Sequence, residues 1–418
     1  EITTFRTEAK YTDKRHPDEI KFAKTLQEDL ARRDFTINAI ALKLKAKSVK
    51  RKTATRKLNQ DDYEIIDLFK GQEDLKNKVI RAVGNADDRF NEDALRMMRA
   101  ARLATVLDFK IEEKTRQAIL KNAHLLKLVS AERIRDEFVK IIMADKATEG
   151  VRLLNELGLL KHIAPELEEG IDVGQNKHHI YNCWEHNVLS LEYAAKKKFG
   201  FEVRLASLFH DIGKPRTKRG EGADSTFYGH EIVGARIVAK ILERLKFPGQ
   251  QAHKITLLVR YHLFYYNVGE VGENSVRRLV RNVGPENLNE LLQVRMSDRV
   301  GSGVPKAEPY KLRHLKYIVE KVSKDPLSAK MLKVDGNDVM KILGIKPGPK
   351  VGQILDVLLG EVLEDPKKNK ADYLRKEVER FGLLPDSKLA EFAEDAKKER
   401  AQVEQKQDKM TKEKYWVT

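Results

Sequence analysis

The apolar residues of this chain recur at helical spacing almost without interruption from residue 87 to residue 380, and this periodicity constrains the fold more than any other feature. Before residue 82 the pattern differs, because short β-branched runs such as 64–67 and 78–81 alternate with helix-like stretches. A chain of 418 residues with 41% hydrophobic content is long enough for about two to four domains. The sequence therefore predicts an α+β fold, in which a small unit with a mixed sheet precedes a long all-helical part.

Glycine and proline cluster at four places within the helical part, and we expect loops or domain boundaries there. After Leu384 the chain is rich in Lys, Glu and Gln and has few apolar positions, which predicts a charged helical tail with frayed ends. The glycine and proline clusters are residues 165–174, 220–223, 301–305 and 344–349.

The charge of the chain favours a polyanionic partner. Lys and Arg total 80 against 64 Asp and Glu, a formal charge of +16, so we expect nucleic acid ahead of a membrane surface. No run approaches the roughly 18 apolar residues that span a bilayer, and no secretory signal opens the chain, which predicts a cytoplasmic protein. Cys183 is the only cysteine, which excludes an internal disulfide and leaves metal binding to His and carboxylate side chains.

Two further segments are candidates for RNA contact. Residues 43–57 hold eight Lys or Arg and no acid, so they form either a solvated hairpin loop or a contact with RNA phosphates. Residues 334–352 place a turn rich in Gly and Pro before an apolar helix. The free N–H groups at such a helix start suit a phosphate, although a tight interhelical turn needs the same residues. The sequence leaves both pairs of alternatives open.

Two adjacent arginines and an aspartate, Arg32 to Asp34, stand directly before an apolar helix start that includes Asn38. The fork-shaped guanidiniums of Arg32 and Arg33 suit the grip of phosphate groups. The carboxylate of Asp34 can accept a hydrogen bond from a ribose hydroxyl. This chemistry suggests a nucleotide-binding segment.

A second charged group lies on the helix predicted for residues 89–99. Glu92, Asp93, Arg96 and Arg99 fall on one helical stripe, because residues three and four apart are neighbours. One interpretation is an internal salt bridge between Glu92 and Arg96. The other is base recognition, since Asp93 can accept from the exocyclic amine of cytosine or adenine while Arg96 donates to the adjacent ring nitrogen. Guanine and uracil present the opposite pattern and would be refused.

In order and spacing, four segments resemble the successive motifs of bacterial-type (class II) tRNA nucleotidyltransferases: residues 32–39, 67–75 with Gly71, 92–96, and 131–134 with Glu137. The resemblance extends to about residue 380. It implies template-independent addition of CCA to the 3′ end of tRNA from CTP and ATP with Mg²⁺. It also implies a ribose sensor, a protein template for the base, and a neck helix at 132–137 that steadies the template. The implied nucleotide-binding residues are Arg32, Arg33, Asp34, Asn38, Asp93, Arg96 and Arg99, with Asp34 as the ribose sensor and Asp93 and Arg96 as the template.

The sequence departs from the family pattern at two places. The family's Gly-Gly turn for the triphosphate and its Asp-x-Asp pair for two metal ions occur nowhere in the 418 residues. Because residues 2–6 resemble the strand after that pair, we expect an N-terminally truncated chain that does not transfer nucleotides by itself. Glu1 is then either an auxiliary metal ligand or a plain strand-end residue. Residues 67–71 read Asp-Leu-Phe-Lys-Gly where the family has Asp-Pro and a small residue, which puts the local loop shape in question.

Histidines and aspartates recur through the middle of the chain. His210 and Asp211 emerge together after an apolar run, at a helix end where a metal and its water can be held. The order His, His-Asp, Asp resembles the HD phosphohydrolase superfamily, which implies an all-helical domain whose metal activates water for attack on a phosphoester. His230 and His262 would complete a second metal site or bind phosphate. Mg, Mn, Ni and Fe all suit such ligands. The implied metal ligands are His186, His210, Asp211 and Asp298.

These resemblances predict five segments: a nucleotidyltransferase head from a palm with a mixed sheet (1–82), a neck with template and RNA-binding helices (83–168), an HD domain (169–303), a C-terminal helical body (304–383) and the charged tail (384–418). The sequence does not separate CCA addition from A-only or poly(A) addition, and it does not fix the oligomeric state. Two other functions stay open for this chain, namely phosphoester hydrolysis by the HD domain and RNA binding without catalysis.

Overall fold

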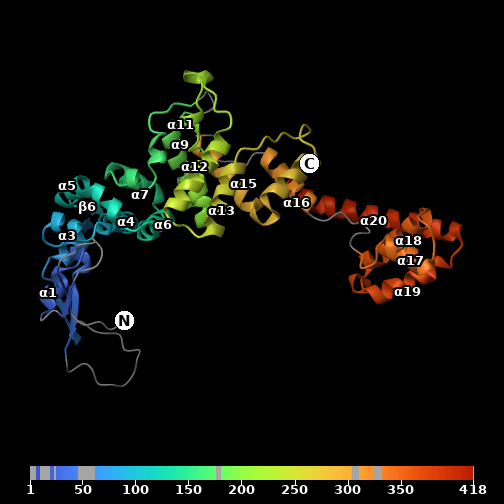
Figure 1. The fold of residues 1–418 in the computed structure, drawn as a ribbon, viewed down its shortest axis with the longest axis horizontal. Coiled ribbons are helices and arrows are strands. Elements are labelled where there is room, and N and C mark those ends of the chain that lie inside the picture. Colours follow the sequence, from blue (N-terminus) through green and yellow to red (C-terminus); the bar gives the residue numbers. More distant parts are fainter. Residues whose placement is uncertain are drawn as a thin grey trace. The chain divides into compact units, whose positions relative to one another are not determined.

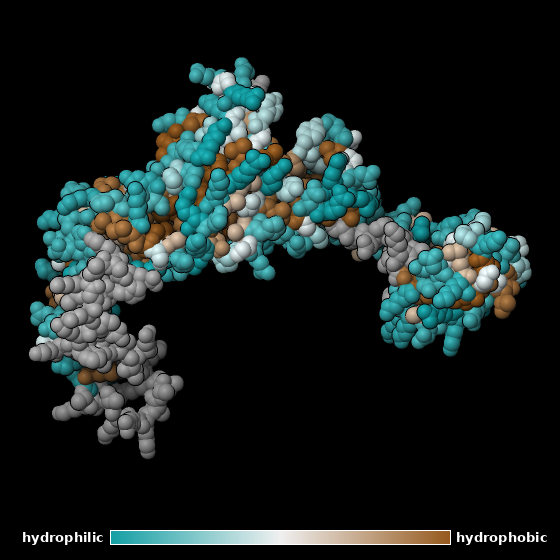
Figure 2. All heavy atoms as spheres, viewed as in Figure 1, coloured by the Kyte–Doolittle hydropathy of each residue, from teal (hydrophilic) through white to brown (hydrophobic). Residues whose placement is uncertain are grey.

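The chain, in a computed structural model, separates into two units (Figure 1). Unit 1 comprises Glu1–Phe264 and Glu286–Lys306, and unit 2 comprises Tyr265–Pro285 and Ala307–Thr418. Hydrophilic residues make up most of the surface visible in Figure 2. No helix among the described residues is long and apolar enough to cross a membrane. The structure describes residues 6–9, 19–22, 25–45, 62–175, 180–303, 310–323 and 332–417.

The described β-structure consists of two-stranded ladders near the start of unit 1. β1 (Arg6–Ala9) pairs antiparallel with β2 (Glu19–Phe22), β3 (Ala41–Leu44) pairs antiparallel with β4 (Tyr63–Ile66), and β5 (Val79–Ile80) pairs parallel with β6 (Lys110–Ile111). The intervening helices are α1 (Leu26–Ala31), the 3₁₀ helix η1 (Thr36–Asn38) and α2 (Gly71–Asn77). Strands lie within both runs for which the sequence predicted them. Parallel and antiparallel pairs followed by helices confirm the α+β fold.

The turn before α2 is fixed by a close approach to η1. A Cβ atom on Gly71 would lie 2.2 Å from the carbonyl oxygen of Thr36, so only glycine fits. Asp67 accepts hydrogen bonds from the backbone N–H groups of Gly71 and Gln72 at 2.7 and 2.8 Å. Lys70 adopts a left-handed backbone with φ of 60°. Residues 67–71, whose sequence departs from the family pattern, thus form a capped turn that holds α2 against η1.

The neck follows as a set of helices around an apolar core. α4 packs against both α6 and α7, and Phe90, Met97 and Phe138 on α3, α4 and α6 are all fully buried. Gly150 lets α7 approach closely, because a Cβ atom there would lie 2.8 Å from Thr105 on α4 and 2.6 Å from Ile141 on α6. The neck elements are α3 (Ala86–Glu92), α4 (Leu95–Leu107), α5 (Glu113–Asn122), η4 (Ala123–Leu128), α6 (Ala131–Met143), α7 (Ala147–Glu156), η5 (Leu160–His162) and α8 (Pro165–Glu168).

The rest of unit 1 is a helical body in which two glycines permit tight packing. A Cβ atom on Gly301 would lie 2.2 Å from the hydroxyl oxygen of Ser190, and one on Gly213 would lie 2.2 Å from the carbonyl oxygen of His230. The helices that carry the predicted metal ligands therefore lie close together. The elements are α9 (Cys183–Lys196), α10 (Phe201–Phe209), α11 (Lys214–Thr217), η6 (Gly222–Asp224), α12 (His230–Arg244), α13 (Gly249–Tyr261) and α15 (Leu288–Gly301).

A buried arginine joins this body to the neck. Arg204, on α10, donates hydrogen bonds to the carbonyl oxygens of Ile142 and Ala144 at 3.1 and 3.0 Å, where α6 ends. It also donates to the carbonyl of Phe199 at 2.9 Å. Burial lowers the pKa of Arg204. The guanidinium thus serves as a cap for the last carbonyls of the neck helix α6.

Unit 2 is all-helical in its described residues. Asp335 caps α17 by accepting hydrogen bonds from the backbone N–H groups of Asn337 and Asp338 at 2.8 and 2.9 Å. Leu389 and Ala393, in the first half of α20, are buried in or against the core formed with α18. The predicted charged tail is thus a helix that packs at its start, while its fraying stays a prediction. The elements are α14 (Glu273–Val283), η7 (Pro285–Asn287, at the unit boundary), α16 (Tyr310–Ser323), α17 (Gly336–Leu343), α18 (Pro349–Glu364), η9 (Pro366–Lys368), α19 (Ala371–Gly382) and α20 (Asp386–Lys414).

Candidate functional site

The predicted nucleotide-binding segment lies between the end of α1 and η1. Phe35 is fully buried and pairs across an isolated antiparallel bridge with Ala82. The backbone N–H of Val83 donates to the carbonyl of Asp34 at 3.1 Å, and the N–H of Thr36 donates to that of Arg81 at 3.0 Å. These bonds fix the backbone on both sides of Phe35, so the side chain of Asp34 has a defined direction.

Asp34 is buried and holds four donors. Its Oδ1 accepts from the backbone N–H of Phe35 at 2.9 Å and from Nδ2 of Asn38 at 3.0 Å. Its Oδ2 accepts from Nε and Nη2 of Arg99, both at 2.6 Å. Asn38 and Arg99, which the sequence grouped with Asp34 as nucleotide-binding residues, therefore contact that carboxylate.

Arg96 lies against the C-terminal end of α1. Its Nη2 donates to the carbonyl of Arg32 at 3.0 Å, and Arg89 donates to the neighbouring carbonyl of Ala31 at 3.0 Å. The last carbonyls of an α-helix point out of its end, and the helix dipole gives this end a negative character that favours guanidiniums. Arg96 also donates to Glu92 at 2.6 Å. The internal salt bridge between these two residues, one of the two interpretations of the sequence, is therefore present.

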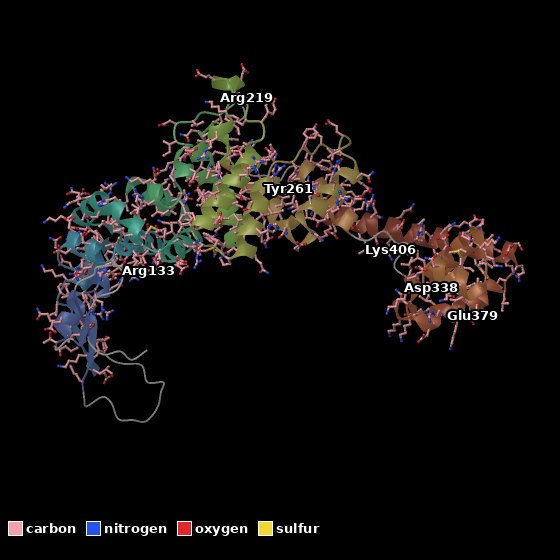
Figure 3. The ribbon with its side chains drawn as sticks, in the orientation of Figure 1. Arg133, Arg219, Tyr261, Asp338, Glu379 and Lys406 are labelled. Carbon is pink, nitrogen blue, oxygen red and sulfur yellow. The ribbon has the colours of Figure 1, made fainter. Side chains whose placement is uncertain are left out.

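The prediction of one continuous helical stripe from Glu92 to Arg99 is wrong. α3 ends at Glu92, Asp93 is extended with φ of −142° and ψ of 104°, and α4 begins only two residues later. Asp93 consequently faces Arg133 of the neck helix α6, whose Nη1 and Nη2 donate to its two carboxylate oxygens at 3.3 and 2.7 Å. Arg133 is labelled in Figure 3. On the same helix Glu137 accepts from Arg102 of α4 at 2.6 Å, so α6 contacts both Asp93 and α4.

Arg32 and Arg33 share a carboxylate that the sequence reasoning missed. Asp29, buried on α1, accepts from Nε and Nη2 of Arg32 at 3.0 and 2.7 Å and from Arg33 at 3.2 Å. The signal was present, because an acid three and four residues before two arginines forms helical ion pairs. Glu1 and most of the basic segment 43–57 lie outside the described residues.

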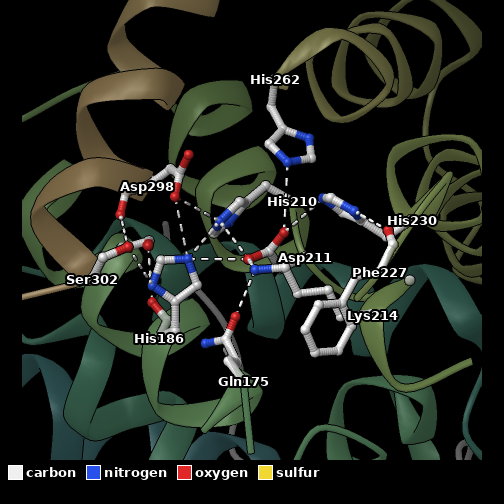
Figure 4. A network of polar contacts seen from close by, with 12 residues as sticks. Gln175, His186, His210, Asp211, Lys214, Phe227, His230, His262, Asp298 and Ser302 are labelled. Atoms are coloured by element: carbon white, nitrogen blue, oxygen red, sulfur yellow. Dashed lines mark hydrogen bonds and ion pairs between the residues drawn. The ribbon is translucent and has the colours of Figure 1, made fainter. Parts of the chain in front are cut away.

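The second cluster gathers all six predicted His and Asp residues from separate helices of unit 1 (Figure 4). His186 lies on α9, and Asp298 lies on α15. His210 ends α10 and Asp211 follows it, while His230 begins α12 and His262 ends α13. These six residues come together only because the helices that carry or adjoin them pack against one another.

The Nε2 atoms of the four histidines converge on two carboxylates. His186 and His210 lie 3.1 and 3.3 Å from Oδ2 of Asp211, and 3.3 and 3.6 Å from Oδ1 of Asp298. The other oxygen of Asp211 faces His230 at 3.2 Å and His262 at 3.5 Å. Among the described residues, the groups able to hold a metal are His186, His210 and Asp298, and His210, Asp211 and His262.

The outer nitrogens show that the set suits a cation. Nδ1 of His210, His230 and His262 lies 2.7 to 2.8 Å from the carbonyl oxygen three residues earlier in each case. A carbonyl only accepts, so Nδ1 carries the hydrogen and Nε2 remains for a cation or for a proton shared with a carboxylate. Buried Nε2 and carboxylate ligands oriented in this way fit a divalent metal.

The electrostatics of the cluster point the same way. Burial raises the pKa of Asp211, but Lys214 and His210 outweigh it and hold that pKa well below its ordinary value. Burial also raises the pKa of Asp298. Hydrogen bonds from His186 and His210 outweigh burial, so the pKa of Asp298 is likewise held well below its ordinary value. Burial lowers the pKa of His210, whereas the two carboxylates raise it to about 10. Two ionised carboxylates in a buried site favour positive charge there.

Lys214 is a member of this cluster that the sequence reasoning missed. Its Nζ lies 2.6 Å from Oδ2 of Asp211 and donates to Oε1 of Gln175 at 2.5 Å. It also lies over the ring of Phe227, whose carbonyl accepts from His230. The available signal was its position three residues after Asp211, one turn along the chain.

Three family models match successive parts of the chain. "Poly A polymerase head domain" matches residues 1–81, "Probable RNA and SrmB- binding site of polymerase A" matches residues 108–171, and "HD domain" matches residues 180–301. The HD match contains the whole cluster from His186 to Asp298. The head and HD matches, together with the convergent His and Asp side chains, support dependence on a divalent metal and do not specify which one.

Curated proteins and solved structures match over most of the chain. The A-adding tRNA nucleotidyltransferase of Deinococcus radiodurans is 33% identical over 356 residues, which cover 81% of this chain and 76% of that protein. The CCA-adding enzyme of Limosilactobacillus reuteri is 33% identical over 379 residues, which cover 91% and 78%. The crystal structure of the Bacillus stearothermophilus CCA-adding enzyme in complex with CTP matches with a TM-score of 0.47 and 24% identity, over 90% of this chain and 78% of that one.

Proposed function

This chain belongs to the family of bacterial-type tRNA nucleotidyltransferases, and we propose on that basis that it adds C, C and A to the 3′ end of tRNA from CTP and ATP. Addition of A alone, or of poly(A), is the alternative within the family, because its relatives include an A-adding enzyme. The observation that carries the proposal is the contact of α4 with the end of α1 and the residues after it, where Arg96 donates to the carbonyl of Arg32 and Arg99 donates to the carboxylate of Asp34. The single cysteine suits the cytoplasm as its compartment.

Base selection falls to Asp93 and Arg96. The carboxylate of Asp93 accepts from the amine on cytosine or adenine, and Arg96 donates to the ring nitrogen beside it. Uracil and guanine offer an acceptor where the amine would be, which leaves Asp93 facing a lone pair and disfavours them. Arg133 holds Asp93, and the carbonyl of Arg32 holds Arg96, so both groups are oriented before a nucleotide binds.

Sugar, phosphate and RNA recognition fall to other residues. Asp34 accepts from a ribose hydroxyl, and Arg32 and Arg33, aligned by Asp29, hold the phosphates. The helices at 108–171, which match the RNA-binding model, supply the tRNA contact together with the net charge of +16.

Nucleotidyl transfer in this proposal uses Mg²⁺, which when bound neutralises the triphosphate and activates the attacking hydroxyl. Among the described residues, both groups that fit a metal belong to the HD body rather than to the head. The described head residues therefore do not supply the ligands for this ion. Their part is to bind and select the nucleotide.

The first test measures equilibrium binding of CTP, ATP, UTP and GTP to the chain. We expect CTP and ATP to bind at least about tenfold more tightly than UTP and GTP, because the wrong bases leave Asp93 unpaired. Arg96→Ala should remove this preference, and Arg236→Ala should keep it, since Arg236 is an exposed residue of α12 in the HD body. Equal binding of all four nucleotides by the unaltered chain would refute the proposed selection.

The second test measures incorporation of labelled CTP and ATP into tRNA that lacks its 3′ CCA, with Mg²⁺. The assay compares the chain with a version preceded by a segment that carries the Gly-Gly and Asp-x-Asp patterns. Addition of C, C and then A by the extended version supports CCA addition, and incorporation of A alone supports the alternative. Steeply salt-dependent tRNA binding with no incorporation by either version would leave an RNA-binding module.

We also propose that the HD cluster hydrolyses a phosphoester. The convergence of four imidazoles and two carboxylates carries this second proposal. A divalent metal held by His186, His210, Asp211 and Asp298 would lower the pKa of a bound water and so supply the nucleophile. Lys214 neutralises Asp211, and the carbonyls of Ser207, Phe227 and Val259 orient three of the imidazoles.

The test of this second activity is metal-dependent hydrolysis of p-nitrophenyl phosphate and bis-p-nitrophenyl phosphate with Mg, Mn, Ni or Fe. His210→Ala and Asp211→Asn should abolish it, and Arg96→Ala should not change it, because Arg96 lies on α4, outside the HD cluster. Activity that survives both cluster substitutions would exclude the HD residues as its source.

A further inference from the structure

The contact between Asp34 and Arg99 links two parts of the site that lie 65 residues apart in the sequence. Arg99 lies on α4, three residues after Arg96, so one helix carries both a base-selecting group and the partner of the ribose sensor. Arg99 donates through Nε and Nη2 to the same oxygen, Oδ2, at 2.6 Å each. Its side chain is 38% exposed while that of Asp34 is 8% exposed, so the contact lies at the edge of the buried site.

The carboxylate of Asp34 is fully engaged by side chains and backbone of the chain itself. A carboxylate has about four lone-pair sites. Phe35 and Asn38 take two at Oδ1, and Arg99 takes two at Oδ2. A ribose hydroxyl that binds Asp34 therefore has to displace one donor. The bonds of Phe35 and Asn38 are internal to the segment, whereas those of Arg99 join two segments and lie at the exposed edge.

A hydroxyl is suited to displace Arg99, because it both donates and accepts a hydrogen bond. It can donate to Oδ2 of Asp34 and accept from an N–H of Arg99, so that neither charged group loses a partner. A sugar that lacks the hydroxyl at this position has no group there that can do both, and it leaves the pair of Asp34 and Arg99 closed. The difference between ribose and deoxyribose is then expressed at this one contact.

We propose that Arg99 determines ribose preference together with Asp34, as the donor to the ribose hydroxyl that Asp34 accepts from. This inference rests on the proposed nucleotide binding and deepens it. The sequence predicted only that Arg99 binds the nucleotide, and this inference assigns Arg99 to the ribose of that nucleotide. Base selection is a separate property, because Asp93 pairs with Arg133 and not with Arg99.

The test compares the affinities of the chain for CTP, 2′-deoxy-CTP, 3′-deoxy-CTP and UTP by equilibrium binding. The unaltered chain should bind CTP at least about tenfold more tightly than one of the two deoxy analogues. In Arg99→Met, which removes every donor, that ratio should fall to within about threefold of one, while the preference for CTP over UTP persists. Arg99→Lys, which retains one donor, should restore part of the ratio.

The control is Arg236→Met, which removes an exposed guanidinium from α12 and should leave both ratios unchanged. An unchanged ribose ratio in Arg99→Met, with the preference for CTP over UTP intact, overturns the inference alone. Loss of both preferences in Arg99→Met and in Arg99→Lys also overturns it, because Arg99 would then support the whole site. If the unaltered chain shows no preference for CTP over UTP, the proposed function itself fails.

Discussion

Arg133 occupies both oxygens of Asp93, which is the most specific contact between the neck and the template segment. A bidentate guanidinium fixes the plane of a carboxylate as well as its position. The base would then meet an acceptor whose direction is set by α6. In the proposed function, selection of the base then depends on Arg133, a residue that need not touch the nucleotide.

We expect Arg133→Met to weaken base selection. Loss of two charge-assisted hydrogen bonds of about 1.5–3 kcal/mol frees Asp93 to rotate, so the preference for CTP over UTP should fall by about tenfold or more. Nucleotide titrations measure this ratio. Lys140→Met on the same helix serves as the control, since Lys140 contacts Glu137 and not Asp93. An unchanged ratio in Arg133→Met would show that Asp93 does not need this support.

Cys183 should be inert to thiol reagents in the folded chain. Its side chain is fully buried, and burial followed by the charge of Asp211 raises the pKa of the thiol to about 12. The reactive thiolate is therefore scarce at pH 8, and its fraction grows only as the pH approaches that value. Labelling with a disulfide reagent at pH 8 should be slow in buffer and complete in denaturant. Fast labelling in buffer would mean that the start of α9 opens readily.

The roles of single residues were predictable where residue type alone decides them. The grouping of His186, His210, Asp211 and Asp298 was predictable because their order resembles that of the HD superfamily, and the structure brings these side chains together. The Asp93 to Arg133 contact could not be predicted, because it depends on an extended residue between two helices that the periodicity merges into one. Asp29, Lys214 and the Asp34 to Arg99 contact needed the register of neighbouring elements.

At the scale of elements, the HD cluster depends on how closely the turn between α10 and α11 approaches α12. Gly213 follows the ligands of α10, and a Cβ atom on it would meet the carbonyl of His230 at 2.2 Å and the backbone N of Gly234 at 2.6 Å. Both neighbours are backbone atoms, which cannot rotate away. A side chain at position 213 has to push this turn away from α12.

Gly213→Ala should therefore weaken metal binding and lower stability. Overpacking of this kind destabilises by about 1–3 kcal/mol, and displaced ligands should reduce metal affinity by about tenfold or more. Calorimetric titration with Mn²⁺ or Ni²⁺ measures the affinity. Gly249→Ala at the start of α13 is the matched control, because a Cβ atom there meets nothing within 4 Å. Equal metal affinities for the two variants would contradict this account.

α10 connects the neck to the HD cluster, with Arg204 near its middle and His210 at its end. Arg204→Met should destabilise the chain by about 2–4 kcal/mol, because it leaves the carbonyls of Ile142, Ala144 and Phe199 buried without this donor. The urea midpoint of unfolding measures the change. Arg236→Met on the exposed face of α12 should shift it by less than about 0.5 kcal/mol. Similar midpoints for the two variants would rule out Arg204 as a major support of the neck.

The sequence predicted helices better than the connections between them. Periodicity located the helical part, and β-branched runs located β4 and β5. The break at Asp93 and the left-handed turn at Lys70 escaped prediction, because each depends on a partner elsewhere, Arg133 in one case and η1 in the other. The start of α20 packs for the same reason, since Leu389 and Ala393 find an apolar partner that composition alone does not reveal.

At the scale of the whole molecule, the division into two units makes stability a property of each unit. Both candidate sites lie in unit 1, because the nucleotide-binding residues and the HD cluster precede Phe264 or lie on α15. A ligand stabilises only the unit that binds it. The two units should therefore respond differently to metal.

We expect two thermal transitions, of which only one shifts with metal. At a concentration of about 100 times its Kd, a metal stabilises its unit by about 2.7 kcal/mol, which raises the corresponding Tm by several degrees. Calorimetry of the chain with EDTA and with Mn²⁺ measures both transitions. Asp211→Asn should abolish the shift and leave the other transition in place. A single transition that moves as a whole would show that the units unfold together.

Substitution of Asp211 disrupts more contacts of the HD cluster than substitution of His230 or His262, and this difference matters for the evolution of the cluster. Each oxygen of Asp211 serves a different pair of imidazoles, so one substitution there disables both pairs at once, whereas loss of His230 or His262 removes one contact. A lineage that still needs the helical body but no longer needs its hydrolytic chemistry is free to lose Asp211 in a single step. Retention or loss of that one aspartate across descendants of this chain should therefore record whether the chemistry is still under selection.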